Sequence, residues 1–290
     1  MGSRNVTVAG PGSISVSMPR PIRAVGSYLR RNLRLPKGWP DALLQIAIWL
    51  CVDTVYELVR GLTEGSHTTA FANGNRVVEL EQSTHTFFEV DFQRLLLDQR
   101  WLIDVTNFLY MNLHFVLCTA FLTWLYLRRN EVFYFVRNVF IGTMAIAIAI
   151  HAVFPTAPPR LLTQYGFVDT IFSFSGVDQD QGAISALVNK YAAVPSVHVG
   201  FALIVGVTAS IISRRRWVKI LWACYPLLML YIVVATGNHF WFDGLVGAAC
   251  AGVAVLLAKY PLTRLRPDHW AWRLPRREPA TVPAPAPARS

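Results

Sequence analysis

The stretch "VPSVHVGFALIVGVTASIISRRRWVK", residues 194–219, decides the fold class of this chain. A proline opens an apolar run, and four basic residues follow the end of that run. The run is near the twenty residues that a helix needs to cross the hydrocarbon of a bilayer. Basic residues beside a span mark its cytoplasmic end. The stretch therefore predicts a transmembrane helix that begins on the opposite face.

Other apolar runs of similar length lie on both sides of this stretch. Composition agrees with a bilayer environment, because 53% of the residues are hydrophobic and only 15% are charged, whereas a soluble domain carries about a quarter charged residues. We therefore predict an all-α integral membrane protein, a six-transmembrane-helix bundle. The predicted spans are residues 41–62, 101–126, 132–154, 195–213, 217–236 and 239–258.

The basic residues predict the orientation of this bundle. With six spans, 21 of the 27 Lys and Arg residues fall on one side of the membrane. They lie before the first span, around the turns after the second and fourth spans, and after the sixth. This distribution places both termini in the cytoplasm. It also accounts for the net charge of +10, so nucleic acid is not expected as a partner.

Three parts of the chain are expected. Residues 1–40 form a basic cytoplasmic segment with no evident cleavable signal, and residues 41–258 form the membrane domain. Residues 259–290 form a basic and then Pro/Ala-rich tail, which we expect to be disordered. The outward segment between the first two spans contains "NRVVELEQSTHTFFEVDFQRLLLDQR", residues 75–100. The pattern of apolar residues in it predicts an amphipathic helix on the outer membrane surface.

The motif "HFWFD" places His239 and Asp243 four residues apart at the start of the sixth span. At this spacing both side chains share one helix face. The carboxylate can accept the proton of one ring nitrogen and leave the other nitrogen free to attack an electrophile. A helix-stabilising His–Asp pair has the same spacing, and this alternative stays open.

The motif "PSVH" begins the fourth span. Pro195 suits the first helical turn, where its missing N–H costs nothing. The free amides near Ser196 and Val197 would form an anion site at the positive end of the helix. His198 lies in the same turn and can donate a proton to a leaving oxygen. The alternative is an interfacial histidine beside a helix that begins with proline.

The stretch "TAPPRLL" supplies Arg160, whose guanidinium can bind phosphate bidentately or anchor the chain to a lipid headgroup. The span count and the charge bias place it near the same membrane face as His198, His239 and Asp243. Together these groups predict a phosphoryl-transfer site that requires neither metal nor cofactor. The four cysteines lie singly in apolar runs and predict neither a disulfide nor a metal site.

With these motifs the chain resembles the type 2 phosphatidic acid phosphatase superfamily. The wording of "FPTAPPRLL", "YAAVPSVHVG" and "GNHFWFDGLVGA" is most similar to its inositol phosphorylceramide synthase-like branch, the inositolphosphotransferases. The resemblance implies that His239 becomes phosphorylated, Asp243 orients it and His198 protonates the leaving group. It also implies that Ser196, nearby backbone amides and Arg160 hold the phosphate.

The chain departs from the family pattern at three positions. The family usually has a lysine seven residues before its first-motif arginine, a proline after that arginine, and an arginine six residues before its third-motif histidine. Here these positions hold Val153, Leu161 and Val233. Lys190, just before the second motif, is a candidate substitute for the missing cations, although a plain interfacial lysine has the same pattern.

Several other polar residues fall inside the predicted spans. Asp53 and Glu57 share a face of the first span, where carboxylates would recognise a polyol headgroup or make interhelical hydrogen bonds worth about 1 kcal/mol each. His151 is expected to line the site without a catalytic role. Only hydrogen bonding is expected of the polar residues of the second span, which are Asp104, Asn107, Asn112 and His114.

These features predict a membrane enzyme that acts on a lipid-linked phosphate ester through a phosphohistidine. A lipid or sugar hydroxyl as acceptor makes it a phosphotransferase of the inositol phosphorylceramide synthase type, which we favour. Water as acceptor makes it a lipid phosphate phosphatase. A second alternative is a non-catalytic lipid-binding or transport protein, because two cationic ligands are missing. The donor, the acceptor and the oligomeric state stay open.

Arginine outnumbers lysine and alanine is abundant, which indicates a GC-rich bacterial genome. The predicted location is then the plasma (inner) membrane, with the site facing the extracytoplasmic side and with phospholipid as substrate and surroundings.

Overall fold

The computed structural model describes residues 35–62, 66–176 and 190–273. Most of the predicted N-terminal segment and most of the predicted tail lie outside these residues. Within them the regular structure is helical, apart from one isolated bridge between Thr156 and Ala192. The all-α class is therefore confirmed.

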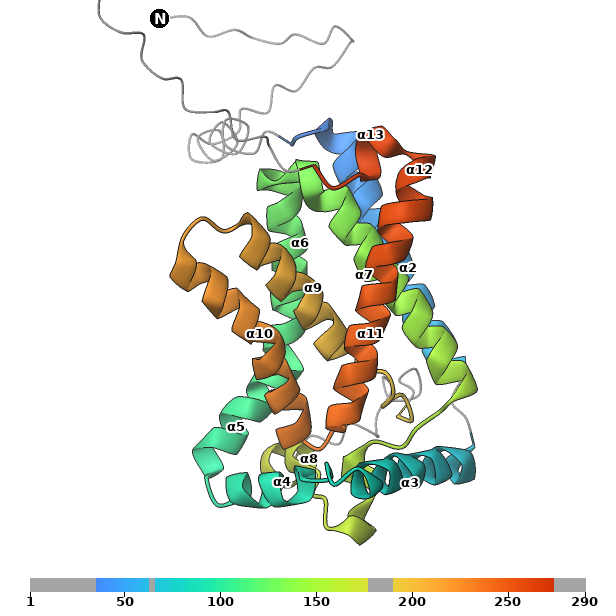
Figure 1. Cartoon of the computed structure of the whole chain (residues 1–290), viewed down its shortest axis with the longest axis vertical. Helices are drawn as coiled ribbons and strands as arrows, with labels where there is room; N and C mark the ends of the chain where they lie inside the picture. The colour runs from blue at the N-terminus through green and yellow to red at the C-terminus, as the bar shows by residue number, and fades with distance from the viewer. Residues whose placement is uncertain (1–34, 63–65, 177–189, 274–290) are drawn as a thin grey trace, which may run out of the picture.

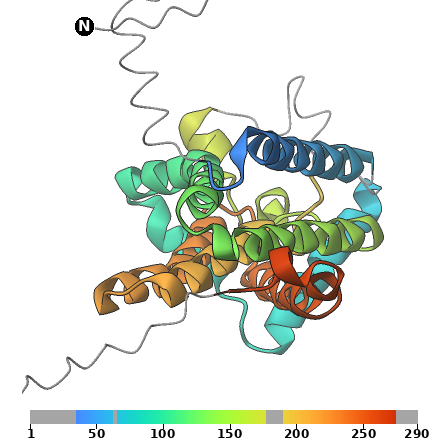
Figure 2. The same cartoon turned by 90° about the horizontal axis from the view of Figure 1, so that it is seen from above.

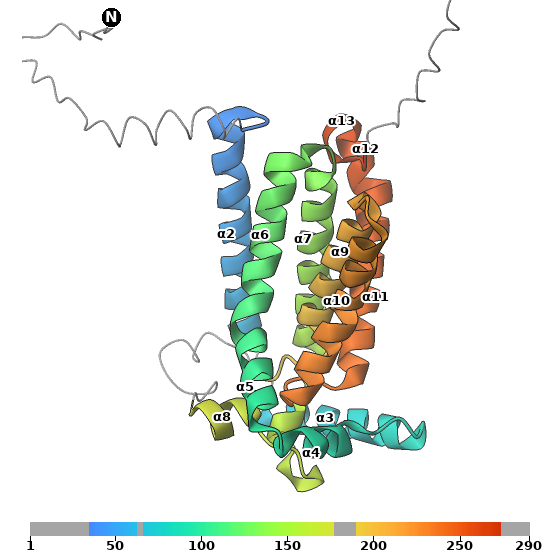
Figure 3. The same cartoon turned by 90° about the vertical axis from the view of Figure 1, so that its left-hand side faces the viewer.

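A bundle of long apolar helices runs along one common direction (Figures 1 and 3). The second of them begins as α5, Arg100–Phe108, and continues through a π-helical turn, Leu109–Leu113. Viewed along the bundle, α7 lies between α2 and α11 (Figure 2). The helices of the bundle are α2 (Gly38–Leu62), α6 (His114–Arg128), α7 (Asn130–Val153), α9 (Val197–Ile212), α10 (Arg216–Ala235) and α11 (Trp241–Leu257).

Five helical segments of the described chain are long and apolar enough to span a membrane. The chain is therefore a multi-pass membrane protein. The fourth predicted span, residues 195–213, corresponds to α9, which is apolar but has only 16 residues. At 1.5 Å per residue it is about 24 Å long, shorter than the roughly 30 Å hydrocarbon core. The count of six and the cytoplasmic placement of the termini stay predictions.

The short helix α9 lies inside the bundle and packs against α6, α7, α10 and α11. Glycine permits the closest of these approaches. A Cβ atom at Gly206 would lie 2.6 Å from the carbonyl oxygen of Trp222 on α10. A Cβ atom at Gly247 of α11 would lie 2.1 Å from the carbonyl oxygen of Ser196, at the start of α9. The first contact brings α9 against α10, and the second brings the start of α9 against α11.

Short helices cross one end of the bundle (Figures 1 and 3). They are α3 (His67–Ser83), α4 (Glu89–Leu97) and α8 (Thr170–Ser175). The single amphipathic helix predicted over residues 75–100 is wrong in detail, because α3 ends at Ser83 and His85 has a φ of 56°. The opposite end carries a π-helical turn, Ala258–Leu262, followed by α12 (Thr263–Leu265) and α13 (Pro267–Trp270).

Candidate active site

His239 lies in the tight connection between α10 and α11. Gly237 makes the turn possible with a φ of 69°, and a side chain there would press against Gln93 and the carbonyl oxygen of Val168. The cap of α11 is Phe240, so His239 precedes the helix. The expectation that His239 and Asp243 share a helix face was therefore wrong in detail. Their contact is nevertheless made, with Nδ1 of His239 3.2 Å from Oδ2 of Asp243.

The hydrogen bonds of His239 define its tautomer. Nδ1 lies 2.9 Å from the carbonyl oxygen of Ala193. A carbonyl can only accept, so Nδ1 carries the hydrogen and donates it to Ala193, with Asp243 as a second acceptor. Nε2 then holds the lone pair. Burial, and then the nearby charge of Arg160, lower the pKa of His239 to about 4, so the ring is neutral near pH 7 and able to attack.

Asp243 holds several backbone groups together at the site. Its side chain is completely buried, and Oδ2 also accepts the N–H of Phe240 at 2.9 Å. Its carbonyl oxygen accepts the N–H of Ser196 at 2.9 Å. One residue therefore orients His239, caps α11 and ties α11 to the start of α9.

The second motif begins α9 two residues later than expected, because the helix starts at Val197. Ser196 is the cap residue and accepts the N–H of Val199 at 3.4 Å, so Pro195 precedes the helix. Ser196 is completely buried and its N–H donates to Asp243. That amide is therefore not available to a phosphate. The neighbouring Val197 does line the cavity.

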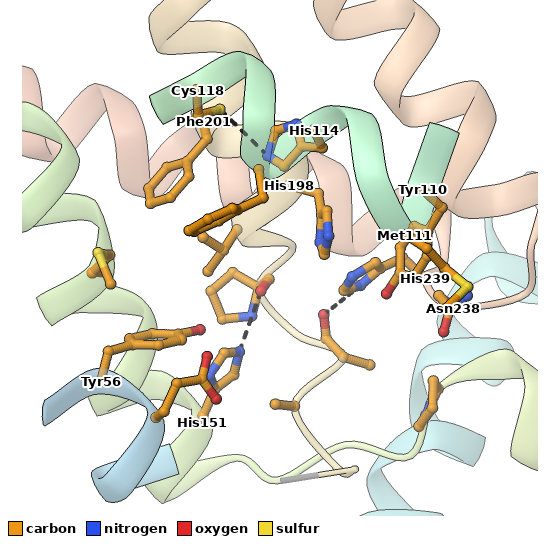
Figure 4. A pocket seen from close by; sticks show the side chains of 18 of the residues that line it. Tyr56, Tyr110, Met111, His114, Cys118, His151, His198, Phe201, Asn238 and His239 are labelled. Atoms are coloured by element: carbon orange, nitrogen blue, oxygen red, sulfur yellow. Dashed lines mark hydrogen bonds between the residues drawn. The ribbon is translucent and has the colours of Figure 1, made fainter. Parts of the chain in front are cut away.

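His198, in the first turn of α9, faces His239 across the cavity, with their ring centroids 5.7 Å apart (Figure 4). Tyr110 stacks on the His198 ring at 4.8 Å between centroids, and the centroid of the His114 ring lies 5.0 Å from that of His198. Tyr110 lies within the π-helical turn that leads into α6, and His114 is the first residue of α6. The irregular turn therefore presents aromatic rings that orient His198.

Arg160 is bound to the same connection that carries His239. It lies in the 3₁₀ turn Pro159–Leu161, and its N–H donates to the carbonyl oxygen of Gly237 at 2.7 Å. Its Nε donates to Asn238 at 3.2 Å, and one terminal nitrogen pairs with Asp169 at 3.3 Å. The guanidinium is thus held beside His239, although Arg160 precedes His239 by 79 residues.

A cavity of about 280 Å³ joins these groups. It is lined by Arg160, Lys190, His198, Asn238 and His239, and on its far side by Asp53 and Glu57 of α2. Of the residues proposed from sequence, the structure therefore brings five around one cavity or directly behind it: His239, His198, Asp243, Arg160 and Lys190. Ser196 lies outside the lining.

Some polar residues predicted inside the spans line the cavity, and others make hydrogen bonds away from it. His151 lines the cavity and lies 3.3 Å from the carbonyl oxygen of Pro195. Asn107 donates to the carbonyl of Thr170 on α8, and Asn112 donates within its own helix. The expectation of hydrogen bonding is confirmed for these two asparagines.

Three kinds of residue at or behind the cavity were not predicted from the sequence. Asn238 precedes His239 and accepts a hydrogen bond from Arg160, so its position beside "HFWFD" was an available signal. Tyr110 gave no signal, because its contact with His198 crosses the bundle. Glu81 and Glu89 were expected on the polar face of a surface helix, and both are completely buried.

Within the described parts of the chain, no three His, Cys, Asp or Glu side chains are grouped in a way that would hold a metal ion.

Comparisons with known proteins identify the family of this chain. The family model of the PAP2 superfamily matches residues 75–257. A phosphoinositol dihydroceramide synthase of Bacteroides thetaiotaomicron is 30% identical over 146 residues, which cover 44% of this chain and 46% of that protein. The match thus spans less than half of the length of the relative. No solved structure matches the chain. The chain belongs to the PAP2 superfamily, the type 2 phosphatidic acid phosphatase superfamily, and within it is similar to the inositol phosphorylceramide synthases.

Proposed function

We propose that this protein is a phosphotransferase that moves a phospho-headgroup from a lipid donor to a hydroxyl acceptor through a phosphohistidine at His239. Its family and its synthase relative support a membrane lipid phosphotransferase or phosphatase. The observation that carries the finer proposal is the arrangement of His239. Its Nδ1 is held by Ala193 and Asp243, while its ring faces His198 across a cavity that Arg160 also lines.

In the first step, Nε2 of His239 attacks the phosphorus of the donor. The bond from phosphorus to the lipid alcohol breaks, and His198 gives its proton to the leaving oxygen. Arg160 stabilises the charge on the non-bridging oxygens. Asp243 stabilises the positive charge that develops on the His239 ring, as the carboxylate of a catalytic triad does.

In the second step, the neutral His198 accepts the proton of the acceptor hydroxyl as that oxygen attacks the phosphohistidine. The N–P bond breaks, and both histidines return to their starting states. Lys190 lines the same cavity, and we propose it as a second cationic ligand. The side chain of Ser196 caps α9, so we assign it to holding the site in shape, while the first-turn amides near Val197 remain candidates for the phosphate.

The far side of the cavity supports a transferase over a phosphatase. Asp53 and Glu57, one turn apart on α2, line it together with Tyr56. Carboxylates are good acceptors for the hydroxyl groups of a polyol. A cavity that holds a polyol headgroup beside the phosphate suits transfer of the whole phospho-headgroup. We further propose that the site faces the extracytoplasmic side of a bacterial plasma membrane, because the basic clusters lie at the other end of the bundle.

The test is an acceptor challenge. The purified protein is given a donor lipid labelled in its headgroup, with ceramide, diacylglycerol or water alone as acceptor. A labelled lipid product that forms only with an added alcohol supports the transferase. Release of free labelled headgroup phosphate with water as sole acceptor would assign a phosphatase instead.

The control separates catalysis from mere binding. His239→Gln should abolish product formation, whereas His269→Gln, at an exposed histidine near the other end of the bundle, should not. Equal lipid-dependent activity in both variants would favour the non-catalytic alternative.

A further inference from the structure

Two completely buried carboxyl groups lie behind the site and take no part in the steps above. Glu81 belongs to α3 and Glu89 to α4, the helices that cross the end of the bundle. Oε1 of Glu89 accepts the N–H of Trp241 at 3.1 Å, and Oε1 of Glu81 accepts the N–H of Phe242 at 3.4 Å. These amides open α11, directly after His239 and Phe240.

Three consecutive amides at the start of α11 therefore end on three different carboxyl groups. Asp243 of α11 itself accepts the first of these N–H groups. Glu89 of α4 accepts the second, and Glu81 of α3 accepts the third. A helix N-terminus has unpaired N–H groups and a partial positive charge, which favour carboxylates in this position. The two crossing helices thus hold the element that carries Asp243.

The two glutamates are not equivalent. Oε2 of Glu89 accepts the N–H of Phe88 at 3.0 Å, so both of its oxygens have backbone donors. Oε2 of Glu81 is buried without a hydrogen-bond partner, and its single backbone contact is the longer one. Donors favour the ionised form of a carboxyl group, and burial without donors favours the neutral form. Glu89 is therefore suited to carry the charge and Glu81 to carry a proton.

The surrounding charges agree with this assignment. Burial and then the charge of Glu89 raise the pKa of Glu81 to about 10, and the charge of Asp243 on α11 acts in the same direction. Burial also raises the pKa of Glu89, against the backbone donors that lower it. Among the ion pairs of the described residues, none joins a Lys or Arg to either glutamate; the nearby Arg94 of α4 pairs with Asp91 at the surface.

We propose that Glu81 and Glu89 are positioning residues that hold one proton between them, with Glu89 as the ionised cap of α11 and Glu81 as its neutral neighbour. This pair keeps His239 and Asp243 in the attacking geometry. Its role in turnover rests on the proposed function, whereas the shared proton rests on the burial of both carboxyl groups, the side-chain hydrogen bond between them and their backbone contacts.

The connection from the pair to His239 is short and rigid. Phe240, between His239 and the Trp241 amide, is completely buried and packs with a small hydrophobic cluster that includes Val77 and Val78 of α3 and Val90 of α4. A shift of the crossing helices would move the nucleophile, and a misplacement of about 1 Å can cost roughly a hundredfold in rate.

The first test measures thermal unfolding of the full-length protein in detergent from pH 6 to pH 10. A glutamate with a pKa near 4.5 when unfolded and about 10 when folded binds a proton only in the folded state across this window, so stability falls as pH rises. The wild type should lose stability toward pH 10. Glu81→Gln, which mimics the protonated carboxyl, should flatten this loss and melt at a higher temperature at pH 9.

The matched control is Glu79→Gln, an exposed glutamate on the same helix, which should keep the wild-type slope. A slope for Glu81→Gln equal to that of the wild type would overturn the shared proton. This readout does not depend on turnover, so it stands apart from the proposed function.

The second test measures kcat and KM for the same variants with the product assay above. Glu89→Gln should lower kcat by about 10- to 100-fold with little change in KM, because it removes the charged cap. Glu81→Gln should keep most of kcat at pH 7 and retain it to higher pH than the wild type. Equal losses in both variants would overturn the assignment.

The two tests also separate the two proposals. If Glu89→Gln does not fold, the pH slope of Glu81→Gln decides the inference by itself. If His239→Gln remains active while the slope behaves as described, the proposed function fails and the carboxyl pair stands. If His239 is phosphorylated but the slope is unchanged, only the carboxyl pair fails.

Discussion

The two ends of the bundle each bury a polar cluster, and the two clusters are built differently. Near the α12–α13 end, Asp41 accepts hydrogen bonds from Tyr126 at 2.9 Å, from Tyr134 at 2.6 Å and from Gln45 at 3.1 Å. Arg137 of α7 donates to Gln45 in turn. Each carboxylate oxygen of this Asp41 cluster has a donor, and the cluster joins α2, α6 and α7.

At the α3–α4 end more of the buried polar atoms lack partners than beside Arg137, where Nδ2 of Asn138 is unpaired. Oδ1 of Asp243, Oε2 of Glu81 and Nε1 of Trp241 are buried without a hydrogen-bond partner. Unpaired buried polar atoms cost stability. The Asp41 cluster therefore stabilises the packing of the spans, whereas the end that carries His239 gives up stability to hold polar groups in place, as the proposed function requires.

The largest effect is expected for Asp243→Asn. The uncharged amide accepts from Nδ1–H of His239 more weakly and cannot stabilise the charged ring, and the cost for such a carboxylate is on the order of 10³–10⁴ in kcat. Because Ala193 still accepts from Nδ1, we expect the lower part of this range. The measurement is kcat for the acceptor-dependent product, and a loss below about tenfold would contradict the role of Asp243.

The next effect is expected for Gly247→Ala, which would place a methyl group 2.1 Å from the carbonyl oxygen of Ser196. The two helix starts must then separate, at a cost of about 3 kcal/mol or more in stability. Thermal unfolding should show this loss together with loss of activity. Gly252→Ala on the same helix, where a methyl group meets nothing within 4 Å, is the matched control and should show neither.

A smaller effect is expected from the titration of His239. Its pKa is about 4 in the folded protein and about 6.5 in an unfolded chain. As pH falls from 6.5 to 4, the unfolded state takes up a proton that the folded state does not bind, so stability falls. His239→Gln should remove this dependence between pH 4 and 6.5. An unchanged acid slope in the variant would show that His239 is not buried in its neutral form.

The smallest effect is expected at the Asp41 cluster. Tyr134→Phe removes one of three donors to Asp41, which should cost about 1 kcal/mol of stability and leave kcat unchanged. Measurement of both quantities sharpens the comparison between the two ends. A fall in kcat without a fall in stability would mean that the two clusters are coupled.

Much of the membrane architecture was predictable from the sequence. Apolar length identifies spans because a helix must satisfy its own backbone in lipid, and the predicted bounds agree closely with α7 and α10. The pairing of His198 with His239 followed from span order and charge bias, because two helix starts on one face can meet. These inferences depend on features of the whole chain.

The parts that could not be predicted depend on contacts between distant segments. Glu81 accepts the N–H of Phe242, which lies 161 residues later in the chain. Helical periodicity alone assigns a glutamate to the solvent-facing side of a helix. The N–H of Ser196 is occupied by the carbonyl of Asp243, a contact that no local pattern contains. The break after Ser83 likewise follows from how α3 and α4 fit across the bundle end.

The central claim is that His239 attacks through Nε2 while Nδ1 is held by Ala193 and Asp243. The most direct measurement is to quench the wild-type enzyme during turnover of a donor labelled in its phospho group, and to map the labelled histidine by mass spectrometry and ³¹P NMR. We expect one acid-labile phosphorus bond, on Nε2 of His239. Label on Nδ1, label on His198, or steady turnover without any phosphoenzyme would contradict the account.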